Sequence, residues 1–347
     1  MAYSSHRAYN WIPPSKVGSV LYTPGETGRA DFIRLNTNEA PWPPPESVIG
    51  AIADTARNGH FYPDPTGEPL RTALARHHGV PETWILVSSG ADGLLDGCFR
   101  AFVRAGDAVQ VWRPTYPVIH LLCATYGAQT ISSSWPPRTD KDDHPVITFV
   151  VNPNSPTGAW IPPITLKEYV CRQHSLVVID EAYAPFAGES MIDAIAENPH
   201  QLVIRTFSKA YSLAGLRVGY AVGVPDVISE LRAAHLPYPT SSCALAAGVA
   251  ALSEPEQHRE MVAFIVNERA RVSERLQALG WEVPQSYTNF LYARPPDGSA
   301  GLINHKLAEA GILVRYFPKI DPEWMRISIG NASDNNSLLQ AITSSTM

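Results

Sequence analysis

Short apolar runs that each end in polar or glycine residues recur between Trp84 and Gly223. They are WILVSS (84–89), AVQVW (108–112), VITFVV (146–151), LVVID (176–180), LVIRTFS (202–208) and VGYAVG (218–223). Helix-length segments separate these runs, and helical spacing also precedes them at 46–57 and 70–79. Such runs are typical of strands buried on both faces of a parallel sheet. The expected fold class is therefore α/β, with a mostly parallel sheet and helices on both of its faces.

The length of the chain predicts more than one domain. Its 347 residues exceed the ~250–300 residues that a single hydrophobic core usually serves. Prolines concentrate between residues 9 and 45, which indicates an extended arm. Beyond Pro237 a long helical stretch precedes short apolar segments, which indicates a smaller α+β domain. We predict the following division: 1–40, the arm and part of the small domain; 41–236, the large domain; 237–347, the small C-terminal domain.

Charge and cysteine content narrow the class of protein. The chain carries 27 basic and 33 acidic residues, and its net charge of -6 argues against nucleic-acid binding. The cysteines are widely spaced and form no C-x-x-C pair: Cys98, Cys123, Cys171 and Cys243. The longest nearly apolar stretch, Ala244 to Leu252, is far shorter than the ~20 residues of a membrane span. We therefore expect a cytoplasmic protein with reduced thiols and no membrane partner.

The polar residues that close the apolar runs are the candidates for chemistry. They are Ser88-Ser89-Gly90, Asn152-Pro153-Asn154, Asp180-Glu181 and Ser208-Lys209. In open parallel sheets a ligand binds beyond the carboxyl ends of the strands, where such residues converge. Each group alone could cap a helix or form a turn, but together they predict one binding crevice.

Lys209 stands out because it directly follows an apolar strand run. A lysine in a partly desolvated crevice has a lowered pKa, and its neutral amine can form a Schiff base. Ser208 and Arg217 could hold a phosphate, and the segment 88–93 leads into a helix whose N-terminus is a ready anion site. Asp180 could pair with a protonated pyridine nitrogen. A lysine, a phosphate site and a strand-end acid together indicate pyridoxal phosphate.

Motifs along nearly the whole chain, from about Leu21 to Ala341, then suggest a family. They are YTPG (22–25), LNTNEAP (35–41), YPDP (62–65), SSGADGLLD (88–96), PTYP (114–117), NPNSPTG (152–158), DEAY (180–183), RTFSKAYSLAGLRVG (205–219), PYP (237–239), TNF (288–290), GILVRYF (311–317) and MRISIG (325–330). The chain resembles the fold type I pyridoxal-phosphate aminotransferases, and within them the histidinol-phosphate aminotransferase branch. The segment around Lys209 is the most specific of these motifs.

The resemblance implies roles for individual residues. Lys209 would form the Schiff base with the cofactor and move the proton between substrate and cofactor. Asp180 would pair with the pyridine nitrogen, and Tyr183 would hydrogen-bond the cofactor's phenolic oxygen. The other residues expected to bind the cofactor are Gly90, Ala91, Ser208 and Arg217 at the phosphate, Tyr116 on the ring, Asn154 at the phenolic oxygen, and Tyr62 from the neighbouring subunit of a homodimer. The residues expected at the substrate are Arg326, which would clamp its carboxylate, and Tyr22, Asn38, Asn289 and Arg315.

The sequence departs from the family pattern at some positions. Ser155 stands directly before PTG, where the family commonly has asparagine, so either Asn154 would take over the asparagine role or the contact would be lost. Gly93 replaces a usual acidic residue, and Glu26 stands where a basic residue is common. The last change would disfavour a phosphorylated substrate.

The expected reaction is amino transfer between an amino donor, which could be histidinol phosphate, and 2-oxoglutarate. The alternatives on the same scaffold are a decarboxylase of the threonine-phosphate type and an aromatic or specialised-metabolism aminotransferase or lyase. A nucleotide-binding α/β protein has little support, since neither G-x-G-x-x-G nor G-x-x-x-x-G-K-[ST] occurs, and no metal-ligand motif is present. A non-catalytic binding protein is equally disfavoured, because the set of functional residues is complete.

Overall fold

A seven-stranded sheet forms the larger part of the computed structural model, which describes residue 25 and residues 31–134 and 145–345. The strands, in spatial order, are β2 (Ile85–Ser88), β8 (Gly219–Gly223), β7 (Gln201–Thr206), β6 (Leu176–Asp180), β5 (Ile147–Val151), β3 (Ala108–Arg113) and β4 (Gln129–Ser134). Only β8 runs antiparallel to its neighbours β2 and β7, and the other strand pairs are parallel. The predicted fold class is confirmed.

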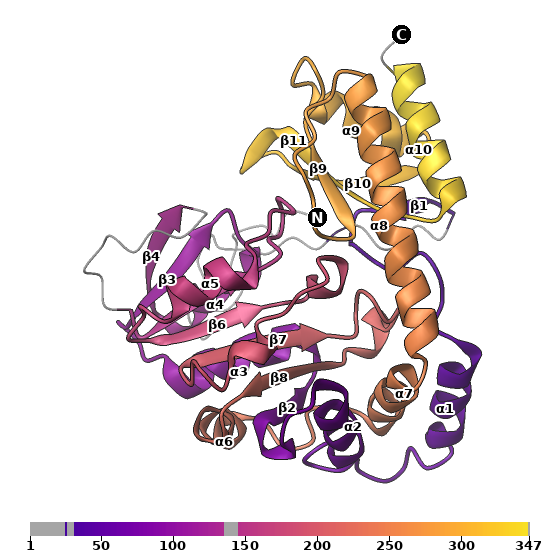
Figure 1. Ribbon diagram of the computed structural model, residues 1–347. Coiled ribbons are helices and arrows are strands. Elements are labelled where there is room, and N and C mark those ends of the chain that lie inside the picture. Colours follow the sequence, from indigo (N-terminus) through magenta and orange to yellow (C-terminus); the bar gives the residue numbers. More distant parts are fainter. Residues whose placement is uncertain (1–24, 26–30, 135–144, 346–347) are drawn as a thin grey trace, which may run out of the picture.

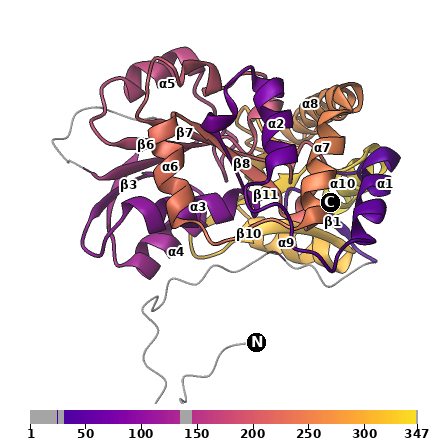
Figure 2. The ribbon, with the colours of Figure 1, turned by 90° about the horizontal axis from the view of Figure 1, so that it is seen from below.

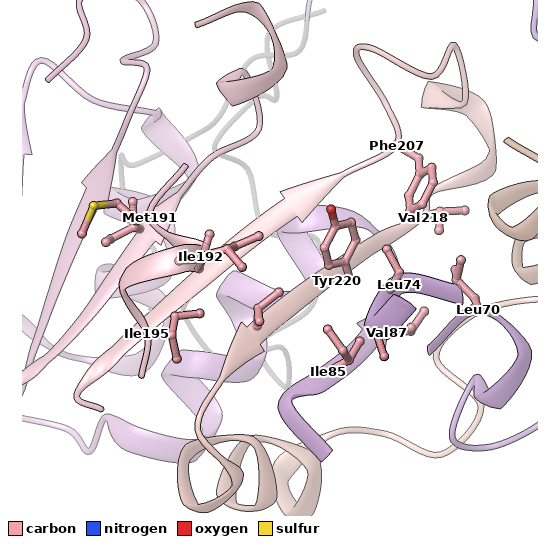
Figure 3. Close-up of a cluster of buried hydrophobic side chains, with 14 of the residues drawn as sticks. Leu70, Leu74, Ile85, Val87, Met191, Ile192, Ile195, Phe207, Val218 and Tyr220 are labelled. Carbon is pink, nitrogen blue, oxygen red and sulfur yellow. The ribbon is translucent and has the colours of Figure 1, made fainter. Parts of the chain in front are cut away.

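Helices cover both faces of this sheet (Figure 2). One face carries α3 (Gly90–Phe102), α4 (Pro117–Tyr126) and α6 (Pro225–Ala234), and the other carries α2 (Glu68–His78), α5 (Pro163–Val170) and α7 (Ser242–Leu252). Successive residues of a strand point to opposite faces of the sheet: Val178 packs with the first set of helices, and Val177 and Ile179 pack with the second. Figure 3 shows part of the second core, where Leu70 and Leu74 of α2 pack beside Ile85 and Val87.

The helix ends follow local sequence signals. Proline occupies the first turn of α4, α5 and α6, where its missing N–H costs no helical hydrogen bond. Gly79 and Gly127 end α2 and α4 in the left-handed conformation, with φ of 66° and 69°. These residues place the turns that lead into β2 and β4.

A second sheet of four strands lies apart from the first (Figure 1). Its order is β1 (Ile33–Leu35), β10 (Ile312–Phe317), β11 (Asp321–Ser328) and β9 (Phe290–Ala293). Helices α8 (Pro255–Ala278), α9 (Ala300–Glu309) and α10 (Ala332–Ser345) accompany it, and α8 extends from α7 to this sheet (Figure 1). Strand β1 is parallel to β10 although it precedes it by almost the whole chain. The small sheet therefore joins both ends of the sequence.

The predicted domain limits stay a prediction. Ile33 and Leu35 of β1 share one hydrophobic cluster with α8, α9, α10 and the other strands of the small sheet, whereas α7 and α1 (Glu46–Ala56) pack with the large sheet. Most of the predicted arm, and both Tyr22 and Glu26, lie outside the described residues. No helix in the described ranges is both long and apolar enough to cross a membrane.

Candidate active site

A cavity of about 170 Å³, here called the Lys209 cavity, lies between the carboxyl ends of the large-sheet strands and the small sheet. Asp180 at the end of β6 and Ser208 and Lys209 after β7 line it from the large sheet. Arg315 on β10 and Arg326 on β11 line it from the small sheet. Residues predicted from separate strand ends thus meet in one crevice.

Lys209 is held in the cavity by the segment after β1. Its Nζ donates a hydrogen bond to the carbonyl oxygen of Thr37 at 3.2 Å and lies 5.9 Å from the ring centre of Tyr183. Burial lowers the pKa of Lys209 to about 8, and the positive charges of Arg326 and Arg217 act in the same direction. The fraction of this amine that is neutral and nucleophilic near neutral pH is therefore far larger than in an ordinary lysine.

Asp180 is a buried acid on the floor of the cavity. Its Oδ1 accepts a hydrogen bond from the backbone N–H of Ala182 at 3.0 Å. Burial, together with the nearby charges of Asp92 and Glu181, raises the pKa of Asp180 to about 7. A cationic group in the cavity would favour its ionised form.

Glu181, the other half of this strand-end pair, serves a different purpose. Its carboxylate accepts hydrogen bonds from Arg205 Nε at 2.9 Å, from Ser190 Oγ at 2.7 Å and from the Met191 N–H at 2.6 Å. Glu181 does not line the cavity and anchors the loop that follows β6.

An anion-binding end is formed where β8 meets the start of α3. A Cβ on Gly219 would lie 2.5 Å from the carbonyl carbon of Gly90, so glycine is required for this close approach. Arg217 reaches the same place, donating from Nη1 to Ser208 Oγ at 3.4 Å and from Nη2 to Asp92 Oδ2 at 2.9 Å. Guanidinium, hydroxyl and the helix N-terminus at Ala91 together suit a phosphate.

On the side of the Lys209 cavity next to Tyr183, residues of the small sheet fix the position of Asn38. Asn38, with a left-handed φ of 55°, donates from Nδ2 to the Tyr183 hydroxyl at 2.9 Å. Asn289 donates to the carbonyl oxygen of Asn38 at 3.0 Å, and Ser328 Oγ accepts from the Asn38 N–H at 2.9 Å. Asn289 itself does not line the cavity, so it acts on the site through Asn38.

Arg326 and Arg315 lie directly opposite each other on adjacent strands. Arg326 donates from Nη1 to Ser155 Oγ at 3.3 Å and from Nη2 to the Asn36 carbonyl oxygen at 3.0 Å. Its guanidinium carbon lies 5.3 Å from the ring centre of Phe290. The two guanidiniums suit a carboxylate or phosphate of the substrate.

The structure distinguishes two neighbouring candidates after β5. Ser155 lines the cavity, whereas Asn154 does not, because its side chain is engaged by the loop after β3 and by its own loop. Asn154 donates to the Pro114 carbonyl oxygen at 2.9 Å and accepts from Thr157 Oγ1 at 2.8 Å. The cofactor role of Asn154 stays a prediction.

Sequence reasoning overlooked Asp92. Its carboxylate accepts from Tyr116 at 3.0 Å and from Arg217 at 2.9 Å, and thereby fixes both predicted cofactor residues at the cavity. Its position directly after Gly90 and Ala91, which were predicted to bind the phosphate, could have indicated that Asp92 lies at the site.

Tyr62 lies away from the cavity of its own chain. It is 82% exposed and its ring stacks on Tyr238, with 4.7 Å between ring centres. Its predicted contact with a neighbouring subunit is compatible with this exposure and stays a prediction.

Comparison with known proteins then defines the family. The model of the family described as aminotransferase class I and II matches residues 30–342. The chain belongs to the aminotransferase class I and II family. It is 38% identical to histidinol-phosphate aminotransferase of Roseiflexus castenholzii, over 90% of this chain and 89% of the relative. It is 33% identical to histidinol-phosphate aminotransferase 1 of Trichormus variabilis, over 96% of this chain and 98% of the relative.

A solved structure of the same kind matches the fold. The crystal structure of histidinol-phosphate aminotransferase from Sinorhizobium meliloti in complex with pyridoxal-5'-phosphate superposes with a TM-score of 0.88. The two chains are 28% identical, and the match covers 97% of this chain and 98% of the other. The predicted family is confirmed.

Proposed function

We propose that the protein is a pyridoxal-phosphate-dependent aminotransferase that exchanges an amino group between histidinol phosphate and 2-oxoglutarate. The observation that carries this proposal is the meeting of Lys209, Asp180 and Arg326 in one cavity. The bound cofactor supplies an aldehyde that condenses with amines and a ring that withdraws electrons from the substrate's α-carbon. The residues around the cavity fit such a group, because a buried acid, a partly buried amine and an anion-binding end are all present.

Lys209 supplies the amine that holds the cofactor and then carries a proton to and from the substrate. Its lowered pKa, about 8, keeps part of the amine unprotonated. The hydrogen bond to Thr37 orients Nζ within the cavity.

Asp180 keeps the pyridine nitrogen protonated. The buried carboxyl is costly to ionise alone, and a cation beside it removes that cost. Asp180 would hold the cofactor at its ring nitrogen, and Ser208 and Arg217 would hold its phosphate.

Arg326 binds the carboxylate of glutamate or 2-oxoglutarate, and Arg315 extends the positive surface toward a phosphate. Since directly paired strand residues share a face, both guanidiniums can contact one substrate. The decarboxylase alternative is not favoured, because relatives about one-third identical over most of their length are histidinol-phosphate aminotransferases.

The proposal includes a homodimer in the cytoplasm. Exposed apolar side chains, namely Phe61, Tyr62, Leu236 and Tyr238, support a contact with a second copy. The four free cysteines suit a reducing compartment.

The decisive experiment replaces Lys209 by alanine and uses Lys167→Ala as the matched control, since Lys167 forms a surface ion pair with Glu197. Wild-type protein and the control should acquire a visible absorption band with pyridoxal phosphate and convert histidinol phosphate in the presence of 2-oxoglutarate. Lys209→Ala should lose this activity, and borohydride treatment of wild type should attach the cofactor to Lys209. Full activity of Lys209→Ala would refute the proposal.

A further inference from the structure

A second cavity of about 290 Å³ adjoins the Lys209 cavity and is here called the side cavity. The two cavities share four lining residues, which are Tyr116, Ser155, Arg315 and Arg326. A substrate whose amino group lies at Lys209 can therefore extend past the two arginines into the side cavity.

Most of the surface of the side cavity is apolar, although polar and charged side chains, Arg113 and His120 among them, also line it. Pro114 and Pro117 line one side, and Phe317 and Ile320 line another. Such walls favour a flat, apolar body such as an aromatic ring. Asp321 is the only carboxylate among the described residues that line it.

Asp321 is fixed by its neighbour Tyr292. The Tyr292 hydroxyl donates to Asp321 Oδ2 at 2.6 Å, and its ring stacks on Trp324 with 4.9 Å between ring centres. Tyr292 is 7% exposed, and burial together with the adjacent carboxylate raises the pKa of Tyr292, so it stays a donor. A carboxylate has about four acceptor sites, and one bond from Tyr292 leaves it able to accept another.

The small sheet aligns this acid with the substrate-binding arginines. Arg315, Arg326 and Tyr292 are paired across β10, β11 and β9, so their side chains lie in one row on the same face. Asp321 stands at the start of β11, opposite Phe317 of β10, where the Tyr292 hydroxyl reaches it. The side cavity therefore has positive charge where it meets the Lys209 cavity and a hydrogen-bond acceptor outside that shared part.

We propose that Asp321, held by Tyr292, is the specificity-determining residue that accepts a hydrogen bond from the ring N–H of the substrate's heterocyclic side chain. The anionic end of the same substrate lies at Arg315 and Arg326. This assignment rests on the proposed function and adds the residue that recognises the heterocyclic ring of the substrate. An apolar side chain offers no N–H to this partly buried carboxylate and displaces water from it, so it binds less well, and glutamate likewise has no ring N–H for Asp321 to accept.

The test compares half-reactions, followed by the loss of visible absorption, for histidinol phosphate, phenylalanine and glutamate. Asp321→Ala should lower kcat/KM for histidinol phosphate by about ten- to hundredfold, mainly through a higher KM. This factor is the usual contribution of a hydrogen bond to a charged group. The same variant should change the glutamate reaction less than about threefold and narrow the preference over phenylalanine. Asp321→Asn keeps the shape and one acceptor oxygen, and should have a smaller effect.

The control is Glu323→Gln, because Glu323 lies on the same strand but pairs with Arg294 on the surface. It should behave as wild type with all three amines. A binding measurement supplements the kinetics: Asp321→Ala in the Lys209→Ala background should weaken histidinol phosphate binding by a similar factor in calorimetry.

The outcomes separate the two proposals. Equal losses with glutamate and histidinol phosphate, or no loss with either, overturn the role of Asp321. A wild-type protein that reacts with glutamate but not with histidinol phosphate also overturns it and leaves amino transfer intact. Failure of wild type to take up pyridoxal phosphate or to react with any amine refutes the proposed function itself.

Discussion

Replacing Asp180 by asparagine should stabilise the cofactor-free protein while abolishing its activity. Burial raises the pKa of Asp180 from 3.8 to about 7. At 1.36 kcal/mol per pKa unit, keeping this acid ionised in the folded chain costs about 4 kcal/mol. Asparagine avoids the cost and still accepts the hydrogen bond from the Ala182 N–H. We expect a gain of about 2–4 kcal/mol above pH 7.

The pH dependence of this gain has a definite sign. Well below pH 3.8 the carboxyl is protonated in both the folded and the unfolded protein, so its ionisation does not affect the free energy of unfolding. Between pH 3.8 and about 7 the unfolded chain releases the proton and the folded chain retains it, so the stability of wild type falls as pH rises. The advantage of Asp180→Asn should grow through this interval and level off above it.

Urea denaturation at pH 4, 6 and 8, without and with pyridoxal phosphate, measures the effect. Asp193→Asn is the control, since Asp193 is an exposed carboxylate in the short helix after the β6 loop. With the cofactor present, wild type should gain more stability than the variant, because only the carboxylate pairs with the pyridinium. A cofactor-free Asp180→Asn protein that is less stable than wild type at pH 8 would refute the reasoning.

Other substitutions test the remaining parts of the site. Gly219→Ala places a Cβ 2.5 Å from the backbone of Gly90. It should lower the free energy of unfolding in urea by about 1–3 kcal/mol and weaken the affinity for pyridoxal phosphate. Unchanged stability would contradict the required close approach. Arg326→Lys should raise the KM for 2-oxoglutarate at least about tenfold, because an ammonium cannot donate in a planar pair, and an unaltered KM would exclude the carboxylate role. Tyr62→Ala should slow the enzyme, and mixing it with Lys209→Ala should restore about a quarter of the activity if each tyrosine serves the other subunit; no recovery on mixing would argue for a site within one chain.

The strands buried on both faces were predictable because their sequence carries the signal. The run LVVID ends at Asp180, as β6 does, and its residues alternate between the two cores. Strand β4 was missed because its sequence, QTISSS, is polar and lies at the sheet edge with one neighbour. The antiparallel direction of β8 was not predicted either, since the sequence of a buried apolar strand does not indicate in which direction the strand runs.

The site was predictable where one residue stands at a strand end and less so where loops decide. Lys209 and Asp180 follow directly from the strand pattern. Which of Asn154 and Ser155 faces the cavity depends on loop hydrogen bonds that join Asn154 to residues 40 positions earlier and 3 later. Asp321 was not found either, because its relation to Tyr292 arises only when β9 and β11 pair.

The parallel pairing of β1 with β10 has a consequence for the order of synthesis. Thr37 and Asn38, which contact Lys209 and Tyr183, directly follow β1. Their strand finds its partner only when residues 312–317 have left the ribosome. A nascent chain can thus assemble the large sheet early, yet it acquires a finished reaction centre only near the end of translation.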